Sequence, residues 1–399
     1  MKRLLIITEA LPPAFAPRMG HLIGELCQQG YEVTAFATQY PQTHCHLPME
    51  GANVHILPYP STKNRLFGAL KSLLGCKSRW FYRAISNTIQ NQAFDIVLCS
   101  TYETFPLPTA LKIAQERNIP LIADLRDITE QFGANYFTNR HRKAPWLGKW
   151  FAQLKIKARN KVVKQASAVT SVSPWHVQYL SQFNPNVHLV YNGYDAKEFY
   201  FKPISSSKFN LVYTGRLVDE KAQDPTLFLQ ALEELITTQQ IDSNNVALHW
   251  YTDPASQKRV QGLVSPYTNV QAITQYHGLV PNQQIPAVLW DSSVVLILTN
   301  QQTPEGPKGM MTTKFFDALG VEKPVLCVKS DEACLAQTIA QTNAGLAATQ
   351  VVEVKAFLLN NYACWKQNGY THQAVNLVEK EKLSRAAMAK EFEKVCCLF

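Results

Sequence analysis

The stretch FNLVYTGRLVDEK, residues 209–221, decides how the rest of this chain is interpreted. It begins as a short apolar run typical of a buried parallel strand, and Gly215 then permits a tight turn with close approach of the backbone. Arg216 and Lys221 follow at the end of that strand, five residues apart. Two cations there can clamp a diphosphate, Arg in a bidentate manner and Lys as a point charge. The alternative is a solvated turn whose charges are partly cancelled by two acidic neighbours.

A glycine-rich loop, residues 306–314, leads into a helix expected over 311–320. The backbone N–H groups at the start of a helix face an anion favourably, and the helix dipole adds to this preference. Thr312 or Thr313 is placed to cap the helix. Asp317 lies one turn further, where a carboxylate either accepts hydrogen bonds from a ribose diol or is a surface acid.

Outward from these two segments, apolar strands alternate with helices along the whole chain. Strands are expected over 3–8, 31–37, 53–57, 95–99, 119–123, 168–172, 188–191, 209–213, 246–251, 270–273, 293–298 and 324–328, and helices over 18–29, 108–117, 226–237 and 311–320. This alternation predicts parallel sheets covered on both faces. The fold class is therefore α/β, with two Rossmann-like domains facing a central cleft.

The expected domain boundaries follow from a polar linker at 200–208. Residues 1–200 are expected to form an N-terminal domain and residues 209–375 a C-terminal domain, while a helix in 376–399 packs back on the N-terminal domain. No G-x-G-x-x-G motif occurs, which disfavours a dinucleotide-dependent dehydrogenase.

The composition of the 399 residues excludes several other classes. With 46% hydrophobic residues the chain can bury large cores, yet it has no apolar run long enough for a transmembrane helix. The run at the N-terminus is too short for a signal peptide and is interpreted as a strand. Nine cysteines without a CxxC motif disfavour a disulfide framework or zinc ribbon, so we expect a reducing compartment and no metal site.

The net charge of +9 comes from two segments, residues 61–83 and 140–164. They hold 15 bases and no acid, so the remaining chain has 24 bases against 30 acids. Both mix their bases with bulky apolar and aromatic residues, a pattern typical of a helix on an anionic membrane surface. An ordinary helix with a solvated basic face is the alternative. No recognition motif for nucleic acid accompanies the charge.

Five short motifs, in order, resemble those of glycosyltransferase family 4 of the GT-B fold, closest to a subset that builds bacterial surface polysaccharides. They are Asp124-Leu125-Arg126-Asp127, Ser171-Val172-Ser173-Pro174, Tyr191-Asn192-Gly193-Tyr194-Asp195, the G-R-L-x-x-E-K run at 215–221, and Lys314-Phe315-Phe316-Asp317-Ala318-Leu319-Gly320 with Lys323-Pro324-Val325. The likeness covers most of residues 1–345.

The resemblance implies a retaining transfer from a nucleoside diphosphate sugar, without a cofactor or bound metal. Arg216 and Lys221 would neutralise the leaving diphosphate as charge builds on it. The remaining donor-binding residues would be Gly215 at the turn, the amides of Met311, Thr312 and Thr313 at the phosphates, and Asp317 at the ribose.

On the acceptor side, the resemblance implies that Asp127 faces the acceptor hydroxyl and the sugar. A salt bridge with Arg126 or a helix cap is the alternative for Asp127. Arg126 and Arg18 are the other acceptor-side candidates, Arg18 for an anionic group in the cleft. The chain departs from the family at Gly309, where a first Glu is usual, and Glu305 is the candidate substitute.

The combined expectation is a cytoplasmic hexosyltransferase, associated peripherally with the inner membrane face. It would add a sugar to a glycan or polyprenyl-linked acceptor during surface polysaccharide synthesis, docked through residues 61–83 and 140–164, with no nucleic acid partner. A nucleotide-sugar epimerase of the same fold and a non-catalytic GT-B scaffold subunit are the alternatives. The sugar, the nucleotide and the linkage are left open by the sequence.

Overall fold

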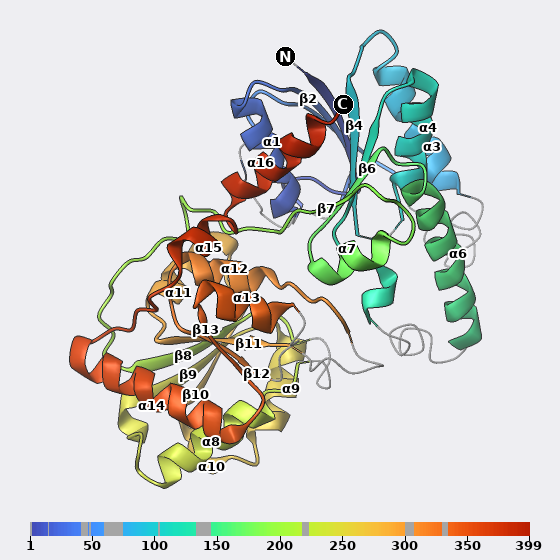
Figure 1. Cartoon of the computed structure of the whole chain (residues 1–399). Helices are drawn as coiled ribbons and strands as arrows, with labels where there is room; N and C mark the ends of the chain where they lie inside the picture. The colour runs from blue at the N-terminus through green and yellow to red at the C-terminus, as the bar shows by residue number, and fades with distance from the viewer. Residues whose placement is uncertain are drawn as a thin grey trace. The chain divides into compact units, whose positions relative to one another are not determined.

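The chain forms two compact units, Met1–Tyr191 with Arg385–Phe399 and Asn192–Ser384, each coloured by position in Figure 1. A computed structural model describes residues 2–14, 16–40, 47, 49–59, 75–102, 104–132, 145–217, 223–299, 307–328 and 334–399. Each unit is built on a parallel sheet with helices on both faces. The predicted α/β class with two Rossmann-like domains is confirmed.

The sheet of the first unit has seven parallel strands in the order β3-β2-β1-β4-β5-β6-β7. They are β1 (Arg3–Thr8), β2 (Glu32–Thr38), β3 (Asn53–Leu57), β4 (Ile96–Thr101), β5 (Leu121–Leu125), β6 (Ala168–Ser171) and β7 (Val187–Leu189). The strands expected in this half from their apolar runs are all present within a few residues. Continuous apolar runs of this kind are typical of strands that are buried on both faces.

Two cores, one on each face, hold this sheet between its helices. Leu4 and Ile6 of β1 pack with α1 and α16, whereas Leu5 and Ile7 point to the opposite core with α3 and α4. This alternation follows from the two-residue period of a strand. The helices are α1 (Pro17–Gln28), α3 (Cys76–Thr88), α4 (Leu107–Arg117), α6 (Pro145–Val163), α7 (Pro174–Leu180) and α16 (Arg385–Cys396), with the short turn η1 (Thr129–Phe132).

The sheet of the second unit has six parallel strands in the order β10-β9-β8-β11-β12-β13. They are β8 (Phe209–Thr214), β9 (Val246–Tyr251), β10 (Thr274–His277), β11 (Val294–Leu298), β12 (Val325–Val328) and β13 (Gly345–Ala348). The strand predicted over 270–273 is wrong, because those residues end the helix α10 and the strand follows it. Val270 and Ile273 are three residues apart, so a helix buries both on one face.

The main core of the second unit lies between its sheet and the helices α8, α10 and α14. Phe209, Leu211 and Tyr213 of β8 contribute to it, with Trp250 from β9. The helices are α8 (Thr226–Thr237), α9 (Pro254–Val264), α10 (Thr268–Ile273), α11 (Ile285–Trp290), α12 (Thr313–Gly320), α13 (Leu335–Thr342), α14 (Val351–Asn368) and α15 (Leu377–Glu381), with the turns η2 (Ser243–Asn245) and η3 (Asn282–Gln284).

The C-terminal segment is divided between the units at Ser384, later than the expected boundary at 375. The helix α15 belongs to the second unit because Lys380 donates to the carbonyl of Gly320 at 3.0 Å and pairs with Glu322 at 2.7 Å. The helix α16 belongs to the first unit, where it packs on α1.

The strand order reverses once in each sheet, between β1 and β4 and between β8 and β11. In open parallel sheets, ligands bind outside the carboxyl ends of the strands at such a reversal. The loops after these four strands are therefore the places to look for functional residues. In the second unit they carry Gly215 after β8 and the segment that leads to α12 after β11.

Candidate active site

The turn after β8 is fixed by hydrogen bonds to its backbone. Gly215 has a φ of 121°, a left-handed conformation that residues with a Cβ rarely adopt. The Tyr213 hydroxyl donates to the carbonyl of Arg216 at 2.9 Å, and the amide of Leu217 donates to Oγ of Ser256 at 3.0 Å. The predicted tight turn at the end of this strand is therefore present.

Arg216 lies on this turn, but its side chain extends largely into solvent, with 71% of it exposed. Its Nε is 3.7 Å from Oδ2 of Asp253, which also caps α9 by accepting the amides of Ala255 and Ser256. These hydrogen bonds, and the charge of Arg216, hold the pKa of Asp253 below its usual value. The guanidinium is thus accessible from solvent rather than enclosed. Lys221 and Glu305, the other predicted residues here, lie outside the described residues.

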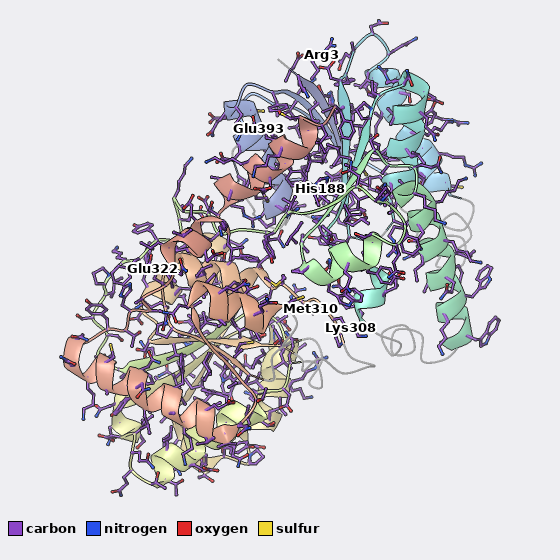
Figure 2. The ribbon with its side chains drawn as sticks, in the orientation of Figure 1. Arg3, His188, Lys308, Met310, Glu322 and Glu393 are labelled. Atoms are coloured by element: carbon purple, nitrogen blue, oxygen red, sulfur yellow. The ribbon has the colours of Figure 1, made fainter. Side chains whose placement is uncertain are left out.

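The start of α12 supplies the amides that the sequence predicts. Thr312 is the N-cap residue, but its side chain makes no capping hydrogen bond within the described residues, and the first turn of the helix carries no acid. Gly309 precedes it with a φ of 63°, and Figure 2 shows Lys308 and Met310 on the segment that leads into the helix. The first amides of a helix lack partners within the helix, so they favour an anion here.

The side chains around this helix start differ in exposure. Met311 is buried, Thr312 and Asp317 are half-buried and Thr313 is exposed. Lys314, which the sequence analysis gave no role at the site, reaches from α12 to the turn at Gly215. Its place within the family motif was the only available signal, because spacing alone does not say where a lysine points.

In the first unit, Asp127 follows β5 by two residues, at the carboxyl end of the sheet. Its Oδ1 accepts a hydrogen bond from Nε2 of Gln131 at 2.8 Å. Burial raises the pKa of Asp127 to about 6, against the opposing effects of Gln131 and Arg126. Among the described residues no salt bridge joins Asp127 to Arg126, whose guanidinium pairs with another carboxylate.

That carboxylate is Glu9, which follows β1. Nη2 of Arg126 lies 3.2 Å from Oε1 of Glu9, and the same oxygen accepts the amide of Tyr102 at 3.1 Å. The guanidinium carbon is 3.6 Å from the centre of the Tyr102 ring, and Nε of Arg126 is buried with no hydrogen-bond partner among the described residues. Arg126 and Asp127 therefore lie beside the reversal between β1 and β4.

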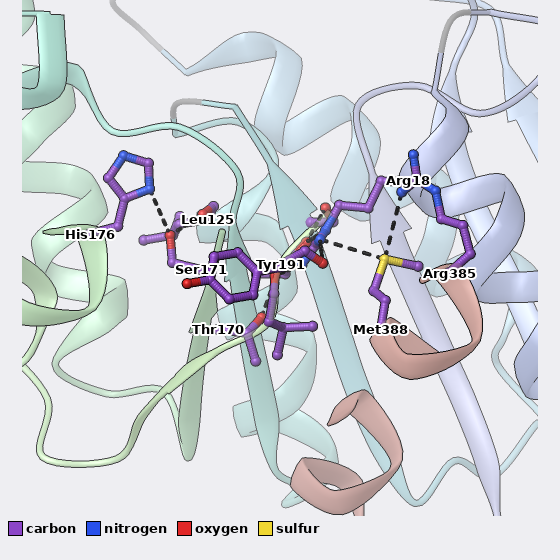
Figure 3. A network of polar contacts seen from close by, with 11 residues as sticks. Arg18, Leu125, Thr170, Ser171, His176, Tyr191, Arg385 and Met388 are labelled. Carbon is purple, nitrogen blue, oxygen red and sulfur yellow. Dashed lines mark hydrogen bonds and ion pairs between the residues drawn. The ribbon is translucent and has the colours of Figure 1, made fainter. Parts of the chain in front are cut away.

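Arg18 does not lie as the acceptor-side prediction expected. It is 3% exposed, and its Nη2 and Nε donate to Asp124 at 2.9 and 3.1 Å. It also donates to the carbonyls of Val190 and Tyr191, both at 3.0 Å, as the polar network in Figure 3 shows. Since its donors are taken by the interior of the first unit, Arg18 is a structural residue and not a contact for an anionic ligand.

The two basic segments are only partly surface elements. Lys77 of α3 lies 4.1 Å from the centre of the Phe105 ring, and burial lowers its pKa against the opposing charge of Glu9. Arg159 of α6 is buried and forms two hydrogen bonds with Glu130, at 2.6 and 2.7 Å. Residues 61–74 and 140–144 of these segments lie outside the described residues.

The rest of α6 presents one exposed face that combines aromatic and basic side chains. Trp146 is 70% exposed, Trp150 49% and Leu154 39%. Lys149, Lys157 and Lys161 are also exposed, as is Lys164 directly after the helix. The spacings of three and four residues place this set along one face of the helix; α6 is labelled in Figure 1.

Neither a metal cluster nor a membrane span is found within the described ranges. No three His, Cys, Asp or Glu side chains gather there to hold a metal ion. None of the helices there has an apolar stretch of the length that a bilayer crossing needs.

Solved structures of similar fold match the chain along nearly its whole length. Sucrose-phosphate synthase from Thermosynechococcus elongatus aligns with a TM-score of 0.66 and 13% identity over 99% of this chain and 98% of that one. HepE from Anabaena in complex with UDP-glucose aligns with a TM-score of 0.66 and 12% identity over 100% of both chains. A glycosyltransferase from Rickettsia africae aligns with a TM-score of 0.62 and 13% identity over 99% of this chain and 97% of that one. The two Rossmann-like domains therefore have the GT-B fold.

Residues 18–198 match the model of Glycosyltransferase Family 4. No curated protein matches the chain significantly. The chain is thus a glycosyltransferase that carries a Family 4 domain over residues 18–198, and both the resemblance and the prediction of an enzyme of this class are confirmed.

Proposed function

We propose that this enzyme is a retaining glycosyltransferase that moves a sugar from a nucleoside diphosphate sugar to a glycan or polyprenyl-linked acceptor in surface polysaccharide synthesis. The observation that carries this proposal is the convergence of the Gly215 turn and the start of α12 at the strand reversal of the second sheet. A glycine turn and open helix amides at such a point suit a diphosphate.

The donor class has independent support from the similar structures. HepE was solved in complex with UDP and with UDP-glucose. In such a transfer the leaving diphosphate gains charge in the transition state, and preorganised donors and cations stabilise that charge most effectively. Arg216 and the amides around Thr312 and Thr313 would provide this stabilisation without a metal ion, with Asp317 at the ribose.

Asp127 would act at the acceptor. With a pKa of about 6, this carboxyl is largely ionised at neutral pH. A carboxylate there can orient the acceptor hydroxyl or stabilise a positively charged sugar centre. Arg126, held in place by Glu9 and the Tyr102 ring, would stabilise the protein surface around Asp127.

The exposed face of α6 supports peripheral docking on the cytoplasmic side of an anionic membrane. Tryptophan rings insert at the headgroup level and each nearby lysine adds about 1 kcal/mol of attraction to an anionic leaflet. Trp146, Trp150 and the lysines of the same face have this arrangement. The docked enzyme would then reach a lipid-linked acceptor at the membrane surface.

A product analysis tests the proposed reaction. The purified enzyme is incubated with UDP- and GDP-sugars and lipid-linked or free glycan acceptors, and the anomeric configuration of the product is read by NMR. An α-linked product from an α-configured donor is expected. A β-linked product would overturn the retaining assignment, and an isomerised free donor without transfer would favour the epimerase.

A further inference from the structure

Lys314 is a half-buried cation of the second unit's candidate site. It is the second residue of α12, and its side chain runs over the turn that follows β8. A Cβ added to Gly215 would overlap Cε of Lys314 and lie 3.0 Å from its Nζ. The missing side chain at Gly215 is therefore what gives the lysine its room.

Among the described residues, few groups compensate the charge of the ammonium group in this position. Burial lowers the pKa of Lys314, and the charge of Asp317 on the same helix opposes that shift only in part. Within the part of the chain that the structure describes, Nζ has no hydrogen bond or ion pair, and the Tyr213 ring centre is 5.9 Å away. Burying a charge without a partner costs free energy. A lysine in such a position therefore indicates a site that binds an anionic ligand.

The surroundings select an anion of compact shape. The helix start at Thr312 presents open amides, no acid lies in the first turn of α12, and the Gly215 turn allows close approach of a ligand to the backbone. Arg216, one residue further, is mostly in solvent and already lies 3.7 Å from Asp253. Compared with Arg216, Lys314 is thus better shielded from solvent.

We propose that Lys314 binds the diphosphate of the sugar donor and stabilises it as it leaves. This inference rests on the proposed function, since it assigns a residue to the donor site. The negative charge of a bound diphosphate favours the protonated form of the lysine, so binding should raise the pKa of Lys314. Gly215 and Lys314 form a functional pair: the glycine is required because the lysine occupies its side-chain space.

The test compares nucleotides that differ by one phosphate. Isothermal calorimetry measures the dissociation constants of UDP, GDP and the corresponding monophosphates and nucleosides for the wild type and for Lys314→Met. The control variant is Lys366→Met, which removes an exposed lysine that also lies near a ring, 5.8 Å from the centre of Tyr362, on α14. Thermal unfolding of each protein without ligand is recorded in parallel.

For Lys314→Met, we expect the affinity for the preferred nucleoside diphosphate to fall about ten- to hundredfold, the usual range for a charged hydrogen bond. Nucleoside affinity should stay within about twofold, and the melting temperature should hold or rise because desolvation of the ammonium no longer costs stability. The control should match the wild type throughout.

Three results would overturn the proposal. Undiminished diphosphate binding by Lys314→Met, while the wild type binds well, would refute the role of the lysine and leave the glycosyltransferase site standing. An equal loss for nucleoside and diphosphate, with a lower melting temperature, would make Lys314 a structural residue. A wild type that binds neither UDP nor GDP would refute the lysine and the proposed donor site together.

Discussion

Arg18 and Asp124 form a two-point ion pair in the interior of the first unit, with N–O distances of 2.9 and 3.1 Å. Asp124 also accepts hydrogen bonds from Ser100 and Thr170, at 2.7 and 2.8 Å. Burial alone would raise the pKa of Asp124, but Arg18 and these hydroxyls hold it below its ordinary value. The pair joins α1 to β5. Arg18, which the sequence suggested as a ligand contact, therefore stabilises the fold of the first unit.

Arg18→Met should therefore destabilise the protein, by roughly 3–5 kcal/mol, because it leaves the carboxylate of Asp124 buried without its partner. Urea unfolding followed by circular dichroism measures this change. The double variant Arg18→Met/Asp124→Asn is the control, and its loss should be smaller than the sum of the two single losses. Strict additivity would show that the pair is not coupled as its geometry indicates.

Asp127→Asn should raise the stability of the protein at alkaline pH and have little effect in acid. The pKa of Asp127 is about 6 in the folded protein against an ordinary value of 3.8. The folded state therefore binds the proton more tightly, and the aspartate costs stability progressively as pH rises from 3.8 through 6. Asparagine avoids that cost, which approaches about 3 kcal/mol at pH 8.

Denaturation of both proteins at pH 4 and pH 8 measures the effect, and the asparagine of the variant can still accept the hydrogen bond from Gln131. Turnover should fall in the same variant, because the proposed role needs the charged carboxylate. For the same reason, kcat/KM of the wild type should fall as pH drops below about 6. A stability difference that does not depend on pH would show that Asp127 is not perturbed by burial.

Replacing Trp146 and Trp150 by serine should weaken binding to anionic vesicles about tenfold or more, because two rings lose their burial in the interface. Co-sedimentation with phosphatidylglycerol vesicles measures it. Leu377→Ser/Val378→Ser is the matched control, since these α15 side chains are 67% and 69% exposed but lack a basic face. Wild-type binding should also weaken with salt, which screens charges over about 8 Å at physiological ionic strength. Equal loss in both variants would refute docking through α6.

The fold is predictable from this sequence because its strands are continuous apolar runs separated by recognisable helices. The segment Val270–Ile273 fails because four apolar or neutral residues fit a strand or one helical turn equally well, and only packing against α8 decides. Among the site residues, those defined by the backbone, such as Gly215 and Thr312, are found from the local pattern. Those defined by long side chains are not: Arg18 pairs with Asp124 and Lys314 lies against Gly215, each about a hundred residues away in sequence and beyond the reach of spacing arguments.

Chelation should leave transfer unaffected. The proposed site neutralises the leaving diphosphate with side chains and amides, so turnover in excess EDTA should equal turnover in added Mg²⁺. A steady-state assay of nucleotide release under both conditions measures this. A large loss of turnover in EDTA that Mg²⁺ restores would show that a metal ion also neutralises the leaving diphosphate.

Arg216→Ala should lower kcat by about 10²–10³, the usual effect of removing one donor that stabilises transition-state charge. Its guanidinium is mostly solvated in the free protein, so the cost should appear in kcat more than in the affinity for the free nucleotide. Lys258→Ala on α9 is the control, because Lys258 is likewise an exposed cation of the second unit. If Arg216→Ala turned over the donor as the control does, Arg216 would be only a partner of Asp253, and the charge on the leaving group would rest on Lys314 and the helix amides.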